Sequence, residues 1–201
     1  MTDLHQNTAM DDLLSAVEHV YRATPALVQF SPWPSKMEKS GLEFRDKPCR
    51  SLVESFDEAG NDLTDPVVDA IRKAADLAHW TQTYTEEEVG RDFLNRYGYF
   101  EIFGPTPTAH YYTDELRGYV GYWDHSLDYG WHNHEAEEIY FCLAGEGLFK
   151  AEGEPDRSVS VGDSKYHASF QPHAMSTTSK PFLCLAFWRG DGVAELPKMT
   201  T

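Results

Sequence analysis

Four side chains capable of metal binding or proton transfer lie close together in the stretch WHNHEAEEIY, which starts at Trp131. They are His132, His134, Glu138 and Tyr140. Imidazole nitrogens and a carboxylate oxygen suit one divalent transition metal, such as zinc, iron, manganese, nickel or cobalt. A partial protein shell also leaves positions for water or substrate. The residue types therefore predict a metal site that can do chemistry.

The spacing of these residues matches that of β-strands. Side chains alternate between the two faces of a strand, so His132 and His134 point the same way. Glu138 and Tyr140 share that parity on the adjacent strand. Lone histidines on strands are mostly surface residues or satisfied core groups, but a pair at strand spacing with a glutamate on the same face favours a metal site.

A fourth ligand is expected from a distant segment. His173 lies in the run QPHAM, after a turn at Gly162 and Asp163, where a return strand would present it. His167 is an alternative for the same role, but its position is less clearly marked by turn residues.

The second half of the chain has the rhythm of an all-β domain. After Pro105 and Pro107, short runs rich in Tyr, Val, Phe, Leu and Ile are separated by turn residues about every eight to twelve positions, which is typical of a sandwich or barrel. The predicted strands are 109–112, 118–124, 131–134, 138–144, 147–152, 157–161, 164–167, 173–177 and 182–188.

Helices are predicted in the first half. Apolar residues recur at helical spacing over residues 11–23 and 66–80, the second helix with Asp65 as its cap and Pro66 in its first turn. A capping box of Thr85 and Glu88 begins a third helix, over 85–98. Residues 41–64 are expected to be mostly loop. We thus expect a helical region, 1–105, packed in one compact unit on a β-barrel, 106–201, that holds the metal site.

The charge of the chain excludes several classes of function. Its 201 residues include 17 basic and 33 acidic side chains, a formal charge of −16. This charge repels nucleic acid and anionic lipid surfaces and favours a cationic or zwitterionic small molecule. No stretch approaches the roughly 18 apolar residues of a membrane span, and the amino terminus has no signal-peptide pattern, so we expect a cytoplasmic protein. The three cysteines show no close pairing and are expected to be buried thiols. A homodimer is compatible with the sequence, which does not specify the oligomeric state.

Two motifs resemble those of the cupins. The pattern His-x-His-x3-Glu-x6-Gly, from His132 to Gly145, is similar to the first cupin motif, and the span from Gly162 to His173 has the length of the second. A narrower resemblance covers most of the chain: LDYGWHNHEAEEIYFCLAGEG, QPHAM and LAFWRGDG are similar to the cupin-type dimethylsulfoniopropionate lyases, above all the DddQ branch and its DddL and DddW relatives. The motifs depart from the generic cupin pattern at four positions: Ser126, Ala168, Phe170 and Thr177.

The resemblance implies a mainly β fold, the cupin β-barrel or double-stranded β-helix (jelly roll), with the helices packed on it. It also implies that a divalent metal assists cleavage of dimethylsulfoniopropionate to dimethyl sulfide and acrylate. Tyr140 is then the catalytic residue, and Tyr129 and Trp188 line the substrate. The implied metal ligands are His132, His134, Glu138 and His173.

Elimination chemistry is consistent with these residues. A β-elimination needs a base for the proton next to the carboxylate, and a metal both stabilises the carboxylate and favours a tyrosine phenolate. The sulfonium leaving group needs no acid, and aromatic faces attract it. Tyr122 and Trp131 join Tyr129 and Trp188 as candidate substrate-binding residues, although most aromatic residues in strands simply pack in the core.

Other functions remain open on the sequence alone. The same ligands would serve another metal-dependent cupin enzyme, a dioxygenase or an isomerase. A non-catalytic cupin that binds a small molecule is a further alternative. Another role for Tyr140 is open as well: its hydroxyl would hydrogen-bond a metal ligand or bind the metal itself.

Overall fold

Helices are confined to the first half of the chain. The structure is a computed structural model that describes residues 2–200. Helix α1 contains the helix expected at 11–23, and its apolar stripe of Leu13, Val17 and Val20 is fully buried. The helices are α1 Thr2–Ala23, α2 Pro25–Phe30, α3 Cys49–Glu54, α4 Asp65–Ala74, α5 Glu86–Val89 and α6 Arg91–Arg96.

Helix α4 differs from the prediction at both ends. Asp65 is already helical and Thr64 is the N-cap residue, because the carboxylate of Asp65 instead accepts a hydrogen bond from the backbone N–H of Gly60 at 2.8 Å. The helix ends at Ala74 rather than at residue 80. The backbone of Trp80 donates to the carbonyl of Arg45, so this part of the chain runs extended beside another loop.

The third expected helix is broken in two. Its capping box of Thr85 and Glu88 is confirmed, but helix α5 ends at Val89, and the next residue, Gly90, has a φ of +80°, a conformation that favours glycine. Helix α6 follows at once. Helix α3 also lies within residues 41–64, which we expected to be mostly loop.

Every predicted strand is present, but the structure differs from the prediction in three respects. Strands β1, β2 and β11 were not predicted, and β5 begins at Asp128, three residues earlier than expected. The runs at 138–144 and 147–152 form one continuous strand, β6. The strands are β1 Glu38–Lys39, β2 Tyr97–Gly104, β3 Ala109–Tyr112, β4 Arg117–Trp123, β5 Asp128–Asn133, β6 Glu137–Ala151, β7 Arg157–Ser160, β8 Ser164–His167, β9 His173–Ser176, β10 Phe182–Arg189 and β11 Lys198–Met199.

Strand β6 continues through Gly145, where a turn was expected. Gly145 has φ +79°, and a Cβ at this position would lie 1.8 Å from the carbonyl oxygen of Pro181. The chain bends here without leaving the sheet, so β6 pairs with β10 and β8 before the bend and with β7 and β9 after it. This long strand is therefore shared by the two groups of strands.

The two faces of the sheet bury two different cores. On β6, Ile139, Phe141 and Leu143 pack with the helices, whereas Tyr140 and Cys142 face the barrel interior. Strands β4 and β10 alternate in the same way. The interior face is the one that carries Glu138, so the alternation expected from the sequence holds for the proposed site.

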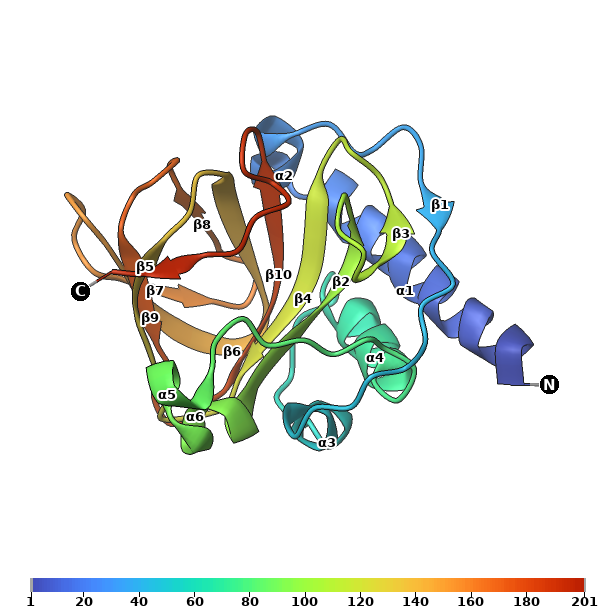
Figure 1. The fold of residues 1–201 in the computed structure, drawn as a ribbon, viewed down its shortest axis with the longest axis horizontal. Helices are drawn as coiled ribbons and strands as arrows, with labels where there is room; N and C mark the ends of the chain where they lie inside the picture. The colour runs from blue at the N-terminus through green and yellow to red at the C-terminus, as the bar shows by residue number, and fades with distance from the viewer. Residues whose placement is uncertain (1, 201) are drawn as a thin grey trace.

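The sheet order is β1-β3-β2-β4-β10-β6-β9-β5-β11, with β7 and β8 paired to β6. Figure 1 shows α1 and α4 against one side of the strands β2 and β4, and the strands β5, β7, β8 and β9 on the far side of β6 and β10. Strands β1 and β2, which lie within the range 1–105 expected to be helical, are also part of this sheet. Among residues 2–200, no helix combines the length and the apolar content needed to cross a membrane.

Candidate metal centre

Glu138 occupies the centre of a row of side chains across the sheet. It pairs with Trp188 of β10 on one side and with His167 of β8 on the other, and Trp188 pairs with Arg117 of β4. Directly opposed residues of antiparallel strands project to the same face. All four side chains are buried.

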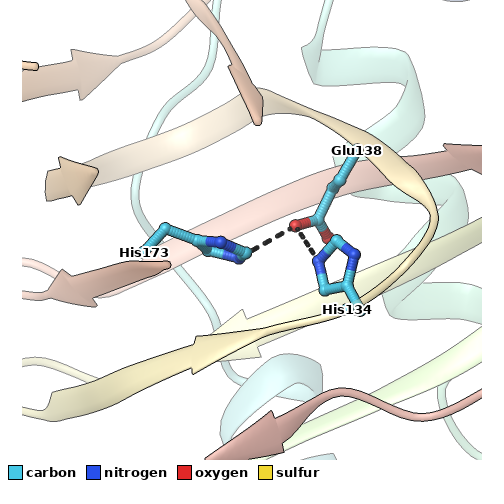
Figure 2. A group of neighbouring side chains, drawn as sticks. All are labelled: His134, Glu138 and His173. Atoms are coloured by element: carbon cyan, nitrogen blue, oxygen red, sulfur yellow. Dashed lines mark hydrogen bonds and ion pairs between the residues drawn. The ribbon is translucent and has the colours of Figure 1, made fainter. Parts of the chain in front are cut away.

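His134, Glu138 and His173 form a group whose potential ligand atoms all lie within 4.8 Å of one another. Oε2 of Glu138 lies 3.1 Å from Nε2 of His134 and 3.3 Å from Nε2 of His173 (Figure 2). Three segments supply them: β6, the start of β9, which pairs with β6, and the residue that follows β5. The structure therefore brings together three of the four expected ligands.

Backbone carbonyls select the tautomer of these two histidines. Nδ1 of His134 lies 2.7 Å from the carbonyl oxygen of Ala136, and Nδ1 of His173 lies 2.8 Å from that of Gln171. A carbonyl oxygen only accepts, so Nδ1 carries the hydrogen in both rings and Nε2 carries the lone pair. This is the tautomer that binds a metal through Nε2.

The second oxygen of Glu138 has different partners. Oε1 accepts hydrogen bonds from the hydroxyl of Tyr119 and from Nε1 of Trp188, each at 2.6 Å. Burial raises the pKa of Glu138, whereas positive charge beside Oε2, which His134 and His173 supply when they are protonated, holds the pKa of this carboxyl well below its usual range. Glu138 is thus an anion with one oxygen directed at the two histidines.

His132, the fourth expected ligand, lies beside this group but outside it. Its ring centroid is 4.1 Å from that of His173 and 6.5 Å from that of His134. Nδ1 donates to the carbonyl of Gly130 at 2.8 Å, so its Nε2 is free as well. Burial, then His173, lowers the pKa of His132 well below its usual range.

Tyr140 faces the barrel interior from the same face of β6 as Glu138. Its ring is 4% exposed, and it packs against Phe149 at 5.1 Å and against Trp123 at 6.3 Å. Burial, and next the charge of Glu138, raises the pKa of Tyr140 well above its usual value. Without a nearby cation this tyrosine is a weak acid and stays protonated.

An aromatic cavity lies next to the group. Its volume is about 20 Å³, room for a single water molecule. A larger ligand therefore enters only when lining side chains move. The lining residues are Thr83, Tyr97, Tyr99, Arg117, Tyr119, Trp123, Tyr129, His132, Tyr140, Trp188 and Pro197.

Two of the four aromatic residues expected to bind substrate line this cavity, and two do not. Tyr129 and Trp188 line it. Tyr122 lies on the opposite face of β4 and packs with Phe56 under the helices. Trp131 is 43% exposed, because an irregularity in the pairing of β5 between Tyr129 and His132 turns the residues between them toward solvent.

Two further buried residues lie near the centre: Tyr119, which was not among the candidate site residues, and His167, which was the alternative to His173 as the distant ligand. Tyr119 holds Glu138, as described above. His167 is 0% exposed and its ring stacks on that of His173 at 4.0 Å, while neither of its ring nitrogens has a hydrogen-bond partner. Burial lowers the pKa of His167 to about 2. The alternation of side chains along a strand was the available signal. Tyr119 lies on the same face of β4 as Trp123, and His167 lies on the same face of β8 as Lys165.

Comparison with known proteins now decides the family. The family model of dimethylsulfoniopropionate (DMSP) lyase matches residues 35–184. The dimethylsulfoniopropionate lyase DddQ of Ruegeria pomeroyi is 35% identical over 184 residues, which is 91% of this chain and 90% of the relative. The chain belongs to the DMSP lyase family.

Solved structures of DMSP lyases have the same architecture. The crystal structure of DddQ from Ruegeria pomeroyi has a TM-score of 0.91 and 34% identity, with 96% of each chain covered. A chain from the crystal structures of the DMSP lyases RdDddP and RnDddQII has a TM-score of 0.94 and 37% identity, with 98% of this chain and all of the other covered. The expected mainly β cupin barrel with packed amino-terminal helices is thereby confirmed, as is the resemblance to the DMSP lyases.

The family match includes the whole candidate centre. His134, Glu138, Tyr140 and His173 all fall within residues 35–184, and Trp188 lies just beyond. The site therefore lies in the part of the chain that the DMSP lyases share. Carbon–sulfur lyase chemistry is the activity class of this family.

Proposed function

We propose that this protein is a metal-dependent lyase that cleaves dimethylsulfoniopropionate to dimethyl sulfide and acrylate by β-elimination. The observation that carries the proposal is the buried group of His134, Glu138 and His173, with Tyr140 on the same face of β6. Membership of the DMSP lyase family supports the substrate, because the Ruegeria pomeroyi relative is a dimethylsulfoniopropionate lyase.

The donor set fits a divalent transition metal. Two Nε2 lone pairs face the Oε2 lone pairs of Glu138 at 3.1 and 3.3 Å. Lone pairs that face one another in a buried site repel, and a cation between them replaces the repulsion with attraction. We assign His134, Glu138 and His173 as ligands and His132 as the fourth. Zinc, iron, manganese, nickel and cobalt all accept such a set.

A metal held by these residues would supply a Lewis acid for the substrate carboxylate and a positive charge that favours the Tyr140 phenolate. The phenolate oxygen of Tyr140 takes the proton from the carbon next to the carboxylate. The electron pair of that C–H bond becomes the second C–C bond of acrylate. The C–S bond breaks with its pair on sulfur, and dimethyl sulfide leaves as a neutral molecule without help from an acid.

The aromatic cavity offers a host for the sulfonium group. Trp188 is poorly suited, because the Arg117 guanidinium, itself a cation, lies over its ring at 5.0 Å. Tyr129 and Trp123 line the cavity with ring centroids 5.6 Å apart. We assign these two rings as the cation host, worth about 0.5–2 kcal/mol for each ring.

The test is an assay of metal-free protein to which each metal is restored. Dimethyl sulfide in the headspace and acrylate in solution should appear in equal amounts, and only when a divalent metal is present. Oxygen consumption with Fe²⁺ in place of acrylate release would contradict the proposal and indicate a dioxygenase. Binding of dimethylsulfoniopropionate without turnover under every metal would indicate a binding protein.

A further inference from the structure

The two oxygens of Glu138 are assigned to different tasks. Oε1 accepts from the hydroxyl of Tyr119 and from Nε1 of Trp188, each at 2.6 Å, and Oε2 faces the Nε2 atoms of His134 and His173. A carboxylate only accepts hydrogen bonds, so both partners of Oε1 are donors. Short bonds of this kind to a buried anion are strong ones.

This division decides how Glu138 can bind a metal. To use both oxygens on one ion, the carboxylate would have to rotate and give up its two donors. In a buried site the abandoned phenol O–H and indole N–H would find no water in exchange, so the rotation is unfavourable. Glu138 therefore offers a single oxygen, and a position on the metal stays open.

A common support holds both donors in place. The Arg117 guanidinium lies 5.7 Å from the ring centroid of Tyr119 and 5.0 Å from that of Trp188. Arg117 is itself fixed by Glu101, with two hydrogen bonds of 3.1 Å, and by the carbonyl of Glu195 at 2.8 Å. Tyr119 is thus part of a rigid buried network and not a freely rotating side chain.

We propose that Tyr119 is a positioning residue that keeps Glu138 bound to the metal through Oε2 alone, so that a coordination position remains open for a substrate carboxylate. The proposal rests on the metal centre of the proposed function. It extends that function by assigning a role to a residue whose own atoms need not touch the substrate.

The chain provides a matched control. Tyr111 is also a buried tyrosine, 4% exposed, whose hydroxyl donates to a carboxylate, that of Asp11, at 2.5 Å. It packs in the core beneath the helices, away from the candidate centre. Tyr111→Phe and Tyr119→Phe remove the same kind of hydrogen bond, so a general loss of stability affects both variants alike.

The experiment measures Co²⁺ affinity by chelator competition and the visible absorption spectrum of the Co²⁺-loaded proteins. We expect Tyr119→Phe to bind Co²⁺ about 10–100-fold more weakly and to show weaker absorption bands, because a second carboxylate oxygen raises the coordination number. Tyr111→Phe should match wild type in both measurements. Wild-type affinity and spectrum in Tyr119→Phe would overturn the proposal.

The same measurements separate this inference from the proposed reaction. If Tyr119→Phe shows the two changes while the wild-type protein releases no dimethyl sulfide, the positioning role stands and the proposed substrate fails. If wild-type protein binds no Co²⁺, the positioning role fails, and acrylate release without metal would then show whether the reaction survives.

Discussion

Nε2 of His173 lies 3.3 Å from Oε2 of Glu138, yet the two atoms share no hydrogen bond. The hydrogen of the imidazole is on Nδ1, which the carbonyl of Gln171 holds at 2.8 Å. The buried anion and the imidazole lone pair are therefore arranged for a third species between them. A metal ion meets this requirement, and it has consequences for stability as well as for catalysis.

Metal binding should stabilise the folded protein. The ligands converge only after folding, so an ion that binds the native state at 100 times its Kd adds about 2.7 kcal/mol to the free energy of unfolding. For a domain of this size that corresponds to a rise in Tm of about 5–10 °C. Thermal unfolding of metal-free protein with and without added Zn²⁺ measures it.

Glu138→Gln is the variant that checks this stabilisation. The amide keeps the shape of the side chain and removes the charge, so added Zn²⁺ should leave the Tm of the variant nearly unchanged. An equal rise in wild type and variant would mean that Zn²⁺ stabilises the protein at another place.

Removal of either histidine of the HNH sequence should lower metal affinity, but to different extents. His134 belongs to the group of atoms within 4.8 Å, whereas His132 lies outside it. We expect His134→Ala to lower metal affinity by more than about 100-fold, beyond the range seen for residues that only support a ligand. His132→Ala should cost less, and chelator competition gives both values.

An equal loss of metal affinity in the two variants would contradict the expectation that His134→Ala costs more. It would mean that His132, assigned above as the fourth ligand, binds the metal as strongly as His134. In that case its ring must turn toward the group when the metal binds.

Local alternation explains why most of the centre could be predicted from the sequence. Strand parity assigned His132, His134, Glu138 and Tyr140 to one face without any knowledge of the partner strands. Strand β2 could not be found in this way, because every residue of YGYFEIFG is buried and the segment shows no alternation of polar and apolar residues. A strand buried on both faces has no periodic signal of its own.

The remaining errors come from pairing between distant strands. The hydrogen bonds from Tyr119 and Trp188 to Glu138 depend on the registers of β4, β10 and β6, which no local pattern encodes. Trp131 is exposed because of an irregularity in β5. Tyr122, in contrast, could have been assigned to the helix side, because it has the opposite parity to Tyr119.

Replacing Tyr140 by Phe should abolish elimination and spare the metal. The variant loses the oxygen that takes the proton, and the loss of a general base costs about 10²–10⁴-fold in kcat. Metal content should stay at the wild-type level, because the ligand atoms are untouched. Acrylate release and metal analysis on the same sample measure the two quantities.

Tyr166→Phe is the matched control for this variant. Its hydroxyl donates to Glu137 on the outer face of the sheet, and the residue is 43% exposed, so activity should be unchanged. Near wild-type acrylate release by Tyr140→Phe would exclude Tyr140 as the base. Loss of bound metal in that variant would instead make the tyrosine a ligand.

The pH dependence of stability should include a contribution from His110, which lies away from the metal centre. His110 is 8% exposed, and its Nε2 accepts a hydrogen bond from the backbone N–H of His79 at 3.1 Å. Burial, and next the charge of His79, lowers the pKa of His110 to about 4 from its ordinary value of 6.5.

A histidine with a lowered pKa in the folded state binds its proton more readily when unfolded. The unfolded chain therefore takes up this proton first as pH falls, so its contribution is complete above pH 6.5 and is lost between pH 6.5 and pH 4. The free energy of unfolding falls by at most about 1.4 kcal/mol per pH unit, or on the order of 3 kcal/mol in all. His110→Asn keeps a hydrogen-bond acceptor without a titrating group. Urea unfolding of the metal-free proteins at pH 7 and pH 4.5 measures the fall in the free energy of unfolding, which should be smaller in the variant than in wild type. An equal fall would mean that His110 is already protonated in the folded protein at pH 4.5.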